Sequence, residues 1–501
     1  MGHERSPNPE PNLVRVGWLV VVDLASRLAG HATATALLER GDRVTYAELS
    51  DRVLRTAAAL RAAGLADGAR VAVAAACTTD GVVAYLGAQA AGLLPVMVSP
   101  RSPAAELQRR FDEVDPALMI LGASARVEVP EGIRVVRPAG STAGDAEVLT
   151  AEPAGVTEVG EDAPAVVLYT SGVSGLPRPV VLTHGNLSAT RTGLIAAPGA
   201  GLDPRTVAFA GLPMSHVFGL NSIIGTVLQA GGKLVLHETF DPVEAAELVA
   251  RHRVTALSAV PLMWKALAEV GDRALFTTID RATFAASSMP RAVAAAVVES
   301  LGLVVAGGFG LTETAGTICH DDPTQPHPGT VGFPLGGAEL RVVDDGEDAL
   351  PGDIGEIWLR GPSVARAYLD GVLVDRTEQG WFRTGDIGVL DDDGRLAIVD
   401  RKKDVINISG FNVSPVEVEL ALMAHEAVDA SVVVGEVDHD REVVVAHVAL
   451  GPGRTATESD LIEHCRTQLS RYKVPARVLI HDELPVTESG KAVRRLLDRS
   501  A

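Results

Sequence analysis

A turn rich in glycine and hydroxyl residues is the first place where this sequence could do chemistry. It follows the apolar stretch AVVLY, and residues 169–182 read YTSGVSGLPRPVVL. Glycines let backbone N–H groups converge on phosphate oxygens, and serine and threonine hydroxyls add further donors. No G-x-x-x-x-G-K-[ST] pattern occurs, so this is not a Walker loop. The residues alone leave two interpretations open, a phosphate cradle and a plain turn.

Further motifs follow this loop in order along the chain. They are LPMSHVFGL (212–220), GGFGLTET (307–314), GWFRTGD (380–386), DRKKDVINISGFNVSPVEVE (400–419) and LPVTESGKAVRR (484–495). In this order, and over nearly the whole chain, they resemble the adenylate-forming superfamily, which includes acyl-CoA synthetases, nonribosomal adenylation domains and luciferase. The resemblance implies that a carboxylic acid is joined to AMP and then passed to a thiol.

The resemblance implies a nucleotide site made from several motifs. Thr312 would donate to the α-phosphate, and Glu313 would hold Mg²⁺, as a hard carboxylate oxygen can. Asp386 would accept from the ribose hydroxyls, unless it only caps a turn, and Arg401 would donate to ribose or phosphate. Phe309 stands where the family usually has tyrosine, and its ring could still stack on adenine. The other expected nucleotide contacts are Thr170, Ser171, Gly172, Ser174, Gly175, Arg178, Ser287, Ser288, Met289, Gly308, Gly310 and Lys491.

The resemblance also assigns catalytic residues, namely Lys491, His216, Thr312 and Glu313. Lys491 would meet the α-phosphate and the substrate carboxylate as charge develops, a task that suits a mobile point cation. His216 would border the acyl pocket near the reacting carboxyl, although a core histidine remains the alternative.

The expected acyl pocket predicts a hydrophobic carboxylic acid as the substrate. Amino-acid-activating relatives carry an aspartate near this motif, whereas residues 215–220 contain no acid. Many of the expected lining residues are small, which predicts a roomy site. The expected lining residues are His216, Val217, Phe218, Gly219, Asn221, Ala286, Gly308, Ala315 and Gly316.

The segment SGFNVSPVEVE looks like the CoA-ligase branch of the superfamily. Ser409, Gly410 and Phe411 would contact CoA, with Gly410 letting pantetheine pass close to the backbone. Lys403 matches the family's hinge, about which the C-terminal domain would swing between adenylation and thioester formation. The expected cofactors are therefore ATP or acyl-AMP, CoA and Mg²⁺, and a carrier protein remains open as the final acceptor.

The phosphate loop departs from the family pattern, roughly [ST]SGTTGxPKG, at three positions. Val173 lacks a hydroxyl, Arg178 replaces a compact ammonium with a planar fork, and Pro179 lacks a backbone donor. All three changes fall at the pyrophosphate end of ATP, which an acyl-adenylate does not have. We therefore expect an acid–thiol ligase whose thioesterification step is intact and whose ATP-dependent adenylation is weak or lost.

Such an enzyme would need a separate adenylating enzyme as a partner, which points towards specialised metabolism. Three alternatives stay open. They are a complete ATP-dependent acyl-CoA synthetase, a stand-alone enzyme that loads a carrier protein, and a non-catalytic adenylate or acyl-CoA binding protein.

The elements that must position these motifs follow an α/β pattern. Residues 45–120 alternate helical apolar spacing with short apolar strands, which predicts a layered α/β body with largely parallel strands. From about residue 330, short alternating strands predict a small β-rich subdomain. After residue 400 the pattern predicts a mobile α+β domain. The expected units are a disordered tail at 1–12, a large N-terminal adenylate-forming domain at 13–400 and a small swinging C-terminal domain at 401–501.

Composition limits the remaining possibilities. A chain of 501 residues with 47% hydrophobic and 22% charged residues predicts a folded protein of more than one domain. The net charge of −20 argues against nucleic acid as a partner. The apolar run 18–22 is too short for a membrane span. Three widely spaced cysteines, Cys77, Cys319 and Cys465, predict reduced thiols and a cytoplasmic protein.

Overall fold

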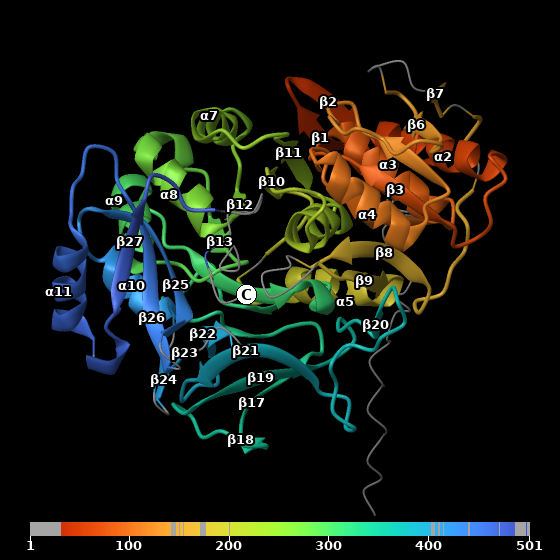
Figure 1. Cartoon of the computed structure of the whole chain (residues 1–501). Helices are drawn as coiled ribbons and strands as arrows, with labels where there is room; N and C mark the ends of the chain where they lie inside the picture. The colour runs from red at the N-terminus through yellow and green to blue at the C-terminus, as the bar shows by residue number, and fades with distance from the viewer. Residues whose placement is uncertain are drawn as a thin grey trace, which may run out of the picture.

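A computed structural model gives the structure of the chain (Figure 1). A large α/β body carries a small antiparallel subdomain, and a smaller C-terminal domain lies beside them, so the predicted fold class is confirmed. The predicted mobility and the exact domain limits stay predictions, and the predicted tail lies outside the described residues. The described residues are 32–141, 147–149, 151–153, 155–170, 177–199, 201–401, 406–408, 411–413, 415–438, 441–469, 471–485 and 497.

The first sheet of the body has the strand order β20-β9-β8-β4-β3-β5-β6-β7. The pairs between β4, β3, β5, β6 and β8 are parallel, as the alternating pattern predicts, whereas β9 runs antiparallel to β8 and β20. Its strands are β3 (Arg70–Ala74), β4 (Leu94–Val98), β5 (Leu118–Leu121), β6 (Val135–Arg137), β7 (Glu147–Val148), β8 (Pro164–Tyr169), β9 (Pro179–Thr183) and β20 (Ala367–Tyr368). The helices joining these strands include α2 (Tyr46–Ala62), α3 (Thr79–Ala90) and α4 (Ala104–Val114).

The second sheet of the body has the order β16-β15-β14-β13-β12-β10-β11-β1-β2. Its strands are β1 (Thr35–Glu39), β2 (Asp42–Thr45), β10 (Val207–Ala210), β11 (Lys233–Leu236), β12 (Ala256–Ala259), β13 (Arg281–Phe284), β14 (Ala306–Leu311), β15 (Gly316–His320) and β16 (Phe333–Pro334). Its helical segments are α5 (His184–Ala196), η1 (Phe218–Gly225), α6 (Thr226–Gln229), α7 (Pro242–His252), α8 (Pro261–Val270), η2 (Arg273–Phe276), α9 (Arg291–Leu301) and η3 (Thr312–Thr314). The central strands β10 to β14 are parallel, so their carboxyl ends, and the loops that follow them, meet at one edge.

The antiparallel subdomain has the strand order β18-β17-β19-β21-β22. These strands are β17 (Glu339–Asp344), β18 (Glu347–Asp348), β19 (Ile354–Arg360), β21 (Phe382–Leu390) and β22 (Leu396–Arg401). The expected short alternating strands are therefore present. Strand β21 brings the GWFRTGD motif to the face of the body.

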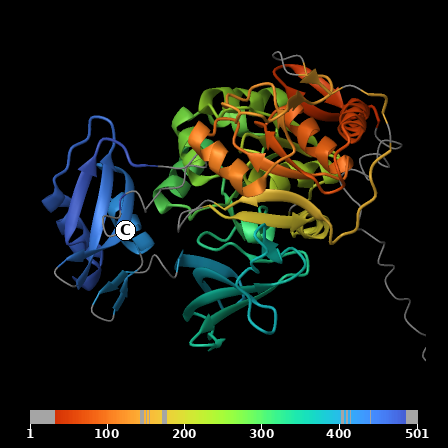
Figure 2. The same cartoon turned by 45° about the vertical axis from the view of Figure 1, so that its right-hand side comes forward.

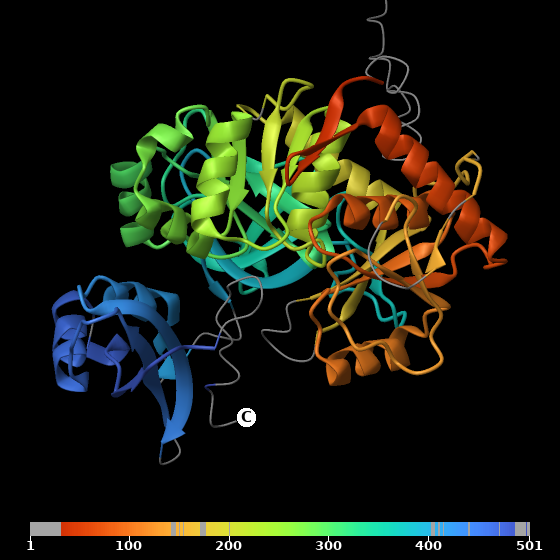
Figure 3. The same ribbon diagram turned by 90° about the horizontal axis from the view of Figure 1, so that it is seen from above.

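The C-terminal domain has its own hydrophobic core, which includes Val418, Leu422, Val433, Val448 and Leu461. Figures 2 and 3 show this domain, in blue, as a separate unit beside the body. Its elements are β23 (Ile406–Ile408), β24 (Phe411–Val413), α10 (Pro415–Met423), β25 (Val428–Asp438), β26 (Arg441–Leu450), α11 (Glu458–Gln468), η4 (Arg471–Lys473) and β27 (Arg477–His481).

Two further expectations about the whole chain can be compared with the structure. Cys77, Cys319 and Cys465 are all buried and form no disulfide, and burial raises the pKa of Cys465 to about 11. Buried thiols with raised pKa values are inert at neutral pH. Among the described residues, no helix is long and apolar enough to cross a membrane.

Candidate active site

A large pocket lies where the body, the antiparallel subdomain and the C-terminal domain face one another. Its volume is about 1760 Å³, above the ~300–1,000 Å³ of an ordinary small-molecule site. Its walls come from α8, α9, β13, β14, β21 and α10. The pocket therefore has room for more than one ligand group at once.

Most of the residues that the motifs single out line this one pocket. The exceptions among the described residues are treated below. The lining includes Thr170, Arg178, His216, Val217, Phe218, Gly219, Ala286, Ser287, Ser288, Met289, Gly308, Phe309, Gly310, Thr312, Glu313, Gly316 and Asp386.

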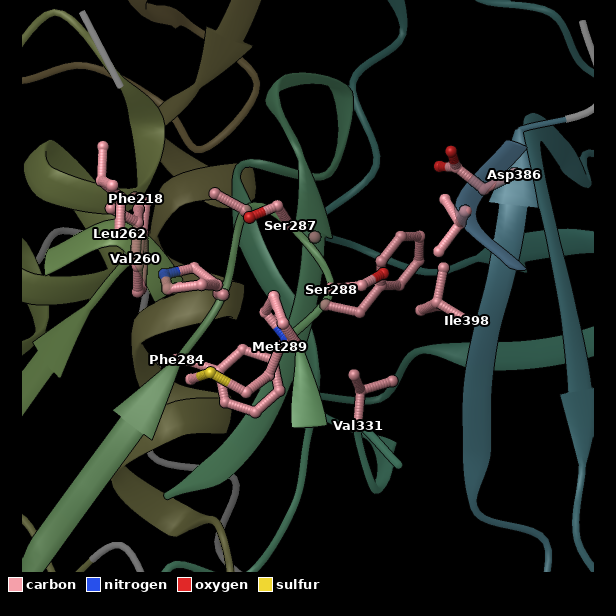
Figure 4. Close-up of a pocket in the computed structure, with 18 of the residues that line it drawn as sticks. Phe218, Val260, Leu262, Phe284, Ser287, Ser288, Met289, Val331, Asp386 and Ile398 are labelled. Carbon is pink, nitrogen blue, oxygen red and sulfur yellow. The ribbon is translucent and has the colours of Figure 1, made fainter. Parts of the chain in front are cut away.

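We call the side of the pocket with Phe218, Val260 and Leu262 its apolar end, and the side where the Asp386 carboxylate lies beside Ile398 its polar end (Figure 4). Phe218, Val260 and Leu262 lie together on one side, and Asp386 lies on the opposite side. The segment 287–289, which follows β13, lies between them. This division separates a place for an apolar group from a place for polar ligand groups.

Asn221 and Ala315 were expected in the lining, but the structure places both outside the pocket wall. The Asn221 side chain is fully buried and serves the packing of three segments. Its Oδ1 accepts from Arg191 Nε at 2.6 Å, and its Nδ2 donates to the carbonyl of Ala315 at 2.7 Å. Both ends of the Asn221 amide are therefore engaged within the scaffold, and the assignment of Asn221 and Ala315 to the acyl pocket stays a prediction.

The turn that carries His216 requires a glycine. His216 N–H donates to the Pro213 carbonyl at 3.2 Å, and the His216 carbonyl accepts from Leu220 N–H at 3.0 Å, which begins the π-helix η1. A Cβ on Gly219 would lie 2.5 Å from the Pro213 carbonyl oxygen. Only glycine fits that close approach, so the SHVFG motif fixes the backbone that places His216 at the pocket.

The segment after β13 holds an unusual backbone conformation. Ala286 has a φ of +75°, which side chains other than glycine seldom adopt. Ala286, Ser287 and Ser288 are exposed, and all three line the pocket. Strained residues of this kind are found at binding sites, where the surrounding structure holds them in place.

Glu313 is held by a tyrosine that the motifs did not reveal. Tyr368 Oη donates to Glu313 Oε1 at 3.1 Å, and the Ala365 N–H donates to the Glu313 carbonyl at 2.7 Å. Burial, followed by the neighbouring charge of Glu313, raises the pKa of Tyr368, so the phenol stays protonated and can donate. Tyr368 is 55 residues from Glu313 in the sequence, and only the fold brings the two together.

Arg178 lies on the other side of the same tyrosine. Its guanidinium carbon is 3.5 Å from the centroid of the Tyr368 ring, and its Nη2 is 3.6 Å from Asp370 Oδ2. A planar guanidinium stacks on an aromatic face better than an ammonium does. The arginine at this position is therefore matched to Tyr368, and it links the phosphate loop to the carboxylate of Glu313.

Pro179 occupies the first position of β9, and the strand ladder shows where its missing donor would point. Pro179 on β9 is opposite Tyr169 on β8. The hydrogen bond from Thr170 N–H to the Arg178 carbonyl joins the next pair of residues, Thr170 and Arg178. The Pro179 carbonyl instead accepts from Leu369 N–H at 2.8 Å. In an antiparallel ladder the N–H and C=O of one residue face the same neighbour. An N–H at position 179 would therefore face the Leu369 carbonyl rather than a phosphate.

Asp386 sits on β21, and its side chain is almost completely buried. The turn around it is capped by other groups. Thr384 Oγ1 accepts from Asp386 N–H at 3.0 Å, and Glu356 Oε1 accepts from Gly385 N–H at 3.2 Å. The side chains of Glu356 and Thr384 therefore satisfy the N–H groups of Gly385 and Asp386.

The C-terminal domain contributes to the pocket through α10, the start of β25 and η4. Lys265 on α8 forms an ion pair with Asp429, which joins the body to the C-terminal domain. Lys473 Nζ lies 2.7 Å from Glu417 Oε2, and both residues line the pocket.

Several predicted site residues fall outside the described part of the chain. Of Arg401 and Phe411 only the backbone is described, with Arg401 opposite Asp386 in the β21–β22 ladder. The residues outside are Ser171, Gly172, Val173, Ser174, Gly175, Lys403, Ser409, Gly410 and Lys491.

Comparison with protein families shows which family the chain belongs to. Residues 24–369 match the family model described as AMP-binding enzyme, and residues 417–491 match the model of its C-terminal domain. The chain belongs to the AMP-binding enzyme family. The predicted resemblance to the adenylate-forming superfamily, and to its acyl-CoA ligase branch, is confirmed.

Similar proteins match from two thirds to nearly all of this AMP-binding enzyme. It is 32% identical to a feruloyl-CoA synthase of Amycolatopsis over 94% of this chain and 96% of the relative. It is 37% identical to a 2-succinylbenzoate–CoA ligase of Geobacillus kaustophilus over 67% of this chain and 69% of the relative.

Solved structures of similar fold agree with this assignment. ATP-bound MatB from Rhodopseudomonas palustris superimposes with a TM-score of 0.85 at 27% identity, covering 96% of this chain and 98% of that chain. The o-succinylbenzoate CoA synthetase of Bacillus subtilis, in complex with its acyl-adenylate, gives a TM-score of 0.82 at 26% identity, covering 95% and 97%.

Proposed function

We propose that this enzyme is a complete acid–CoA ligase, which joins a hydrophobic carboxylic acid to AMP with ATP and then transfers the acyl group to CoA. The observation that carries the proposal is the convergence of the motif residues on one pocket with an apolar end and a polar end. Relatives that are named as CoA synthases and CoA ligases support it.

The polar end suits an adenosine phosphate. We assign the adenine to the ring of Phe309, the ribose to Asp386 with Arg401, and the α-phosphate to Thr312 and Lys491. The other expected nucleotide contacts, including Ser287 and Ser288, keep the roles given above. These groups would orient the α-phosphorus for attack by the substrate carboxylate.

Glu313 fits a magnesium ion. Among the described residues no cluster of three or more His, Cys, Asp or Glu side chains could hold a metal alone. Mg²⁺ is commonly bound by one or two carboxylates together with substrate phosphates, which is the arrangement that Glu313 offers. When bound, Mg²⁺ would neutralise charge on the phosphate oxygens. Tyr368 would orient the Glu313 carboxylate for this role.

The C-terminal domain would serve both half-reactions. We propose that rotation about Lys403 presents Lys491 for adenylation and then Ser409, Gly410 and Phe411 for CoA. The domain limits of 13–400 and 401–501 remain part of this proposal.

The expectation that adenylation is weak or lost finds no support. The relatives are named for the whole ligation. An N–H at position 179 would face Leu369 rather than a phosphate, so Pro179 is no longer a reason for that expectation. The stacking of Arg178 on Tyr368 weakens a second, because it gives the arginine a structural partner of its own.

We expect a Pro179→Gly variant to change ATP–pyrophosphate exchange by less than about threefold. The new N–H would restore a ladder bond to Leu369, worth about 0.5–1.5 kcal/mol of stability, and would not reach the nucleotide. The measurement is acid-dependent exchange together with the melting temperature. A rise in exchange of tenfold or more would show that proline disables the phosphate site.

The proposed function is tested by assaying the two half-reactions separately with a panel of hydrophobic acids. We expect acid-dependent ATP–pyrophosphate exchange, and formation of acyl-CoA and AMP when CoA is added. Turnover of synthetic acyl-AMP without any exchange would support the half-enzyme instead. A lack of turnover in both assays, despite tight binding of acyl-AMP, would support a binding protein.

We expect Tyr368→Phe to raise the Mg²⁺ concentration needed for half-maximal activity several-fold and to lower kcat/KM for ATP by about tenfold. One hydrogen bond to a charged group contributes about 1.5–3 kcal/mol, and 1.4 kcal/mol corresponds to tenfold. The phenylalanine ring keeps the surface on which Arg178 stacks, so the melting temperature should change little. An unchanged Mg²⁺ dependence would mean that Glu313 is positioned by other groups.

A further inference from the structure

A second, smaller cavity lies directly behind the apolar end of the large pocket. Its volume is about 60 Å³. The two cavities share part of their walls, so little more than one layer of residues separates them. The shared wall residues are Phe218, Phe284, Ala285, Gly308 and Thr317. Gly308 and Ala285 carry the smallest side chains of that wall.

The lining of this second cavity, which we call the rear chamber, places six polar residues among eight apolar ones. It comes from α5, η1, β12, β13, β14 and β15 and from the residues near their ends. Its polar lining residues are Ser222, Ser258, Arg281, Thr283, Thr317 and His320.

The hydroxyl groups of the rear chamber have hydrogens left to donate. Thr317 donates to Ser222 Oγ twice, from its N–H at 3.0 Å and from its Oγ1 at 3.2 Å. Both lone pairs of that oxygen are then used, so the Ser222 hydroxyl can act only as a further donor. Ser258 Oγ and Thr283 Oγ1 are 2.7 Å apart, and whichever donates leaves the hydrogen of the other available.

Arg281 adds to this donor character, and His320 adds a ring nitrogen that can donate or accept. The Nε of Arg281 and the Nδ1 of His320 are buried and have no hydrogen-bond partner among the described residues. Arg281 Nη1 donates to Asp280 Oδ1 at 2.8 Å, which balances the arginine charge locally. Burial lowers the pKa of His320, so its ring is neutral at pH 7 and offers one N–H donor and one acceptor nitrogen.

We propose that the rear chamber receives the far end of the acyl group and selects acids whose distal substituent is a neutral hydrogen-bond acceptor, such as a keto or hydroxyl oxygen. The inference rests on the proposed function and narrows its substrate class. The chamber is far smaller than the large pocket. It therefore fits one small substituent rather than a second ring.

The hydrogen-bond donors of the chamber should favour a distal oxygen over a methyl group of the same size. An acid with a distal oxygen replaces the water that the donors would otherwise hold. A methyl group of the same size displaces that water without satisfying the donors, and a site built for a hydrogen bond rejects the analogue that lacks it. A distal carboxylate is disfavoured relative to the neutral group, because Asp280 already balances the charge of Arg281.

The test uses pairs of acids that are equal in size and differ only at the far end. Suitable pairs are 5-oxohexanoic and 5-methylhexanoic acid, and 3-(4-hydroxyphenyl)propanoic and 3-(4-methylphenyl)propanoic acid. Longer homologues of each pair are then assayed to find the chain length with the highest kcat/KM. We expect the wild type to favour the oxygen-bearing acid of the best pair by tenfold or more in kcat/KM. A preference for the methyl acid in every pair would overturn the inference.

Variants show whether the rear chamber causes the preference. In Ser258→Ala/Thr283→Val, both hydroxyls are replaced with little change in volume, and the preference should fall below threefold, chiefly through a higher KM for the oxygen-bearing acid. The single Thr283→Val variant should show an intermediate preference, which keeps the test available if the double variant is unstable. The matched control is Thr277→Val, an exposed threonine that lines neither cavity, and its preference should equal that of the wild type.

Failure of this inference can be distinguished from failure of the proposed function. If acids are turned over and Ser258→Ala/Thr283→Val keeps the wild-type preference, the chamber does not recognise the distal substituent. Only the inference about the rear chamber then fails. If no acid in the panel is turned over, the proposed function fails. Binding of the same acids is then measured by calorimetry in the presence of ATP, and equal affinities within each pair would overturn the chamber as well.

Discussion

Gly308→Leu is expected to lower kcat/KM for the acid by at least about 100-fold while the protein stays folded. Gly308 lies in the wall between the acyl end of the large pocket and the rear chamber. A leucine side chain there would occupy space that the acyl group needs. A loss of 100-fold corresponds to about 2.7 kcal/mol, which is within the cost of excluding a buried apolar group of that size. The measurement is steady-state acyl-CoA formation together with the melting temperature.

Gly308 is suited to this experiment because its neighbours leave room for a Cβ atom. A Cβ there would meet the Phe284 carbonyl oxygen and Thr317 Cγ2 at 3.4 Å, which is ordinary contact. At Gly307 a Cβ would lie 2.2 Å from the Thr330 carbonyl oxygen, and at Gly310 it would lie 2.0 Å from that of Gly316. Substitution at either of those glycines would strain the fold, so it could not report on the pocket alone.

Gly308→Ala is the matched control, and its kcat/KM should stay within a few-fold of the wild type. Calorimetry with ATP separates the two roles expected of Gly308. Binding of ATP by Gly308→Leu should be retained if the leucine fills the acyl end. Loss of ATP binding would assign Gly308 to the nucleotide instead, and full activity on the acid would show that the acyl group lies elsewhere.

The sequence predicted the main features of the fold because its patterns are local. Apolar periodicity between residues 45 and 120 determines alternating helices and strands, and the twist and crossover rules leave few other ways to assemble them. The short alternating strands after residue 330 likewise form the sheet that carries Asp386. Motifs such as SHVFG and GGFGLTET locate pocket residues because their glycines are needed for close backbone contacts.

Other parts of the site depend on contacts between distant segments, which local patterns do not reveal. Tyr368 meets Glu313 only because β20 pairs with β9, and nothing in the residues around Tyr368 indicates that contact. Asn221 directly follows the motif LPMSHVFGL, yet its amide is bonded to Arg191 and to the carbonyl of Ala315. The sequence suggests that Pro179 removes a donor to phosphate, but the pairing of β9 with β20 shows that an N–H at position 179 would face Leu369. The rear chamber combines residues from 194 to 323, so it is a property of the packing alone.

The second large effect is expected at Asp386. We expect Asp386→Ala to lower kcat/KM for ATP by about 1,000-fold. The carboxylate would accept hydrogen bonds from both ribose hydroxyls, each contributing about 1.5–3 kcal/mol, and the sum of about 3–6 kcal/mol corresponds to roughly 10²–10⁴-fold. The melting temperature should fall only slightly, because Thr384 and Glu356 satisfy the N–H groups of the turn.

Nucleotides that lack ribose hydroxyls separate the ribose role of Asp386 from a structural one. The wild type should discriminate against 2′,3′-dideoxy-ATP by about the factor that Asp386→Ala loses, since the same two hydrogen bonds are removed from the other side. In Asp386→Ala that discrimination should vanish, and Asp386→Asn, which keeps the shape and one acceptor oxygen, should lie between the two. If Asp386→Ala still preferred ATP to the dideoxy nucleotide by the wild-type factor, the ribose would be held by other groups. The lost activity would then have to come from the fold of β21, and a large drop in melting temperature should accompany it.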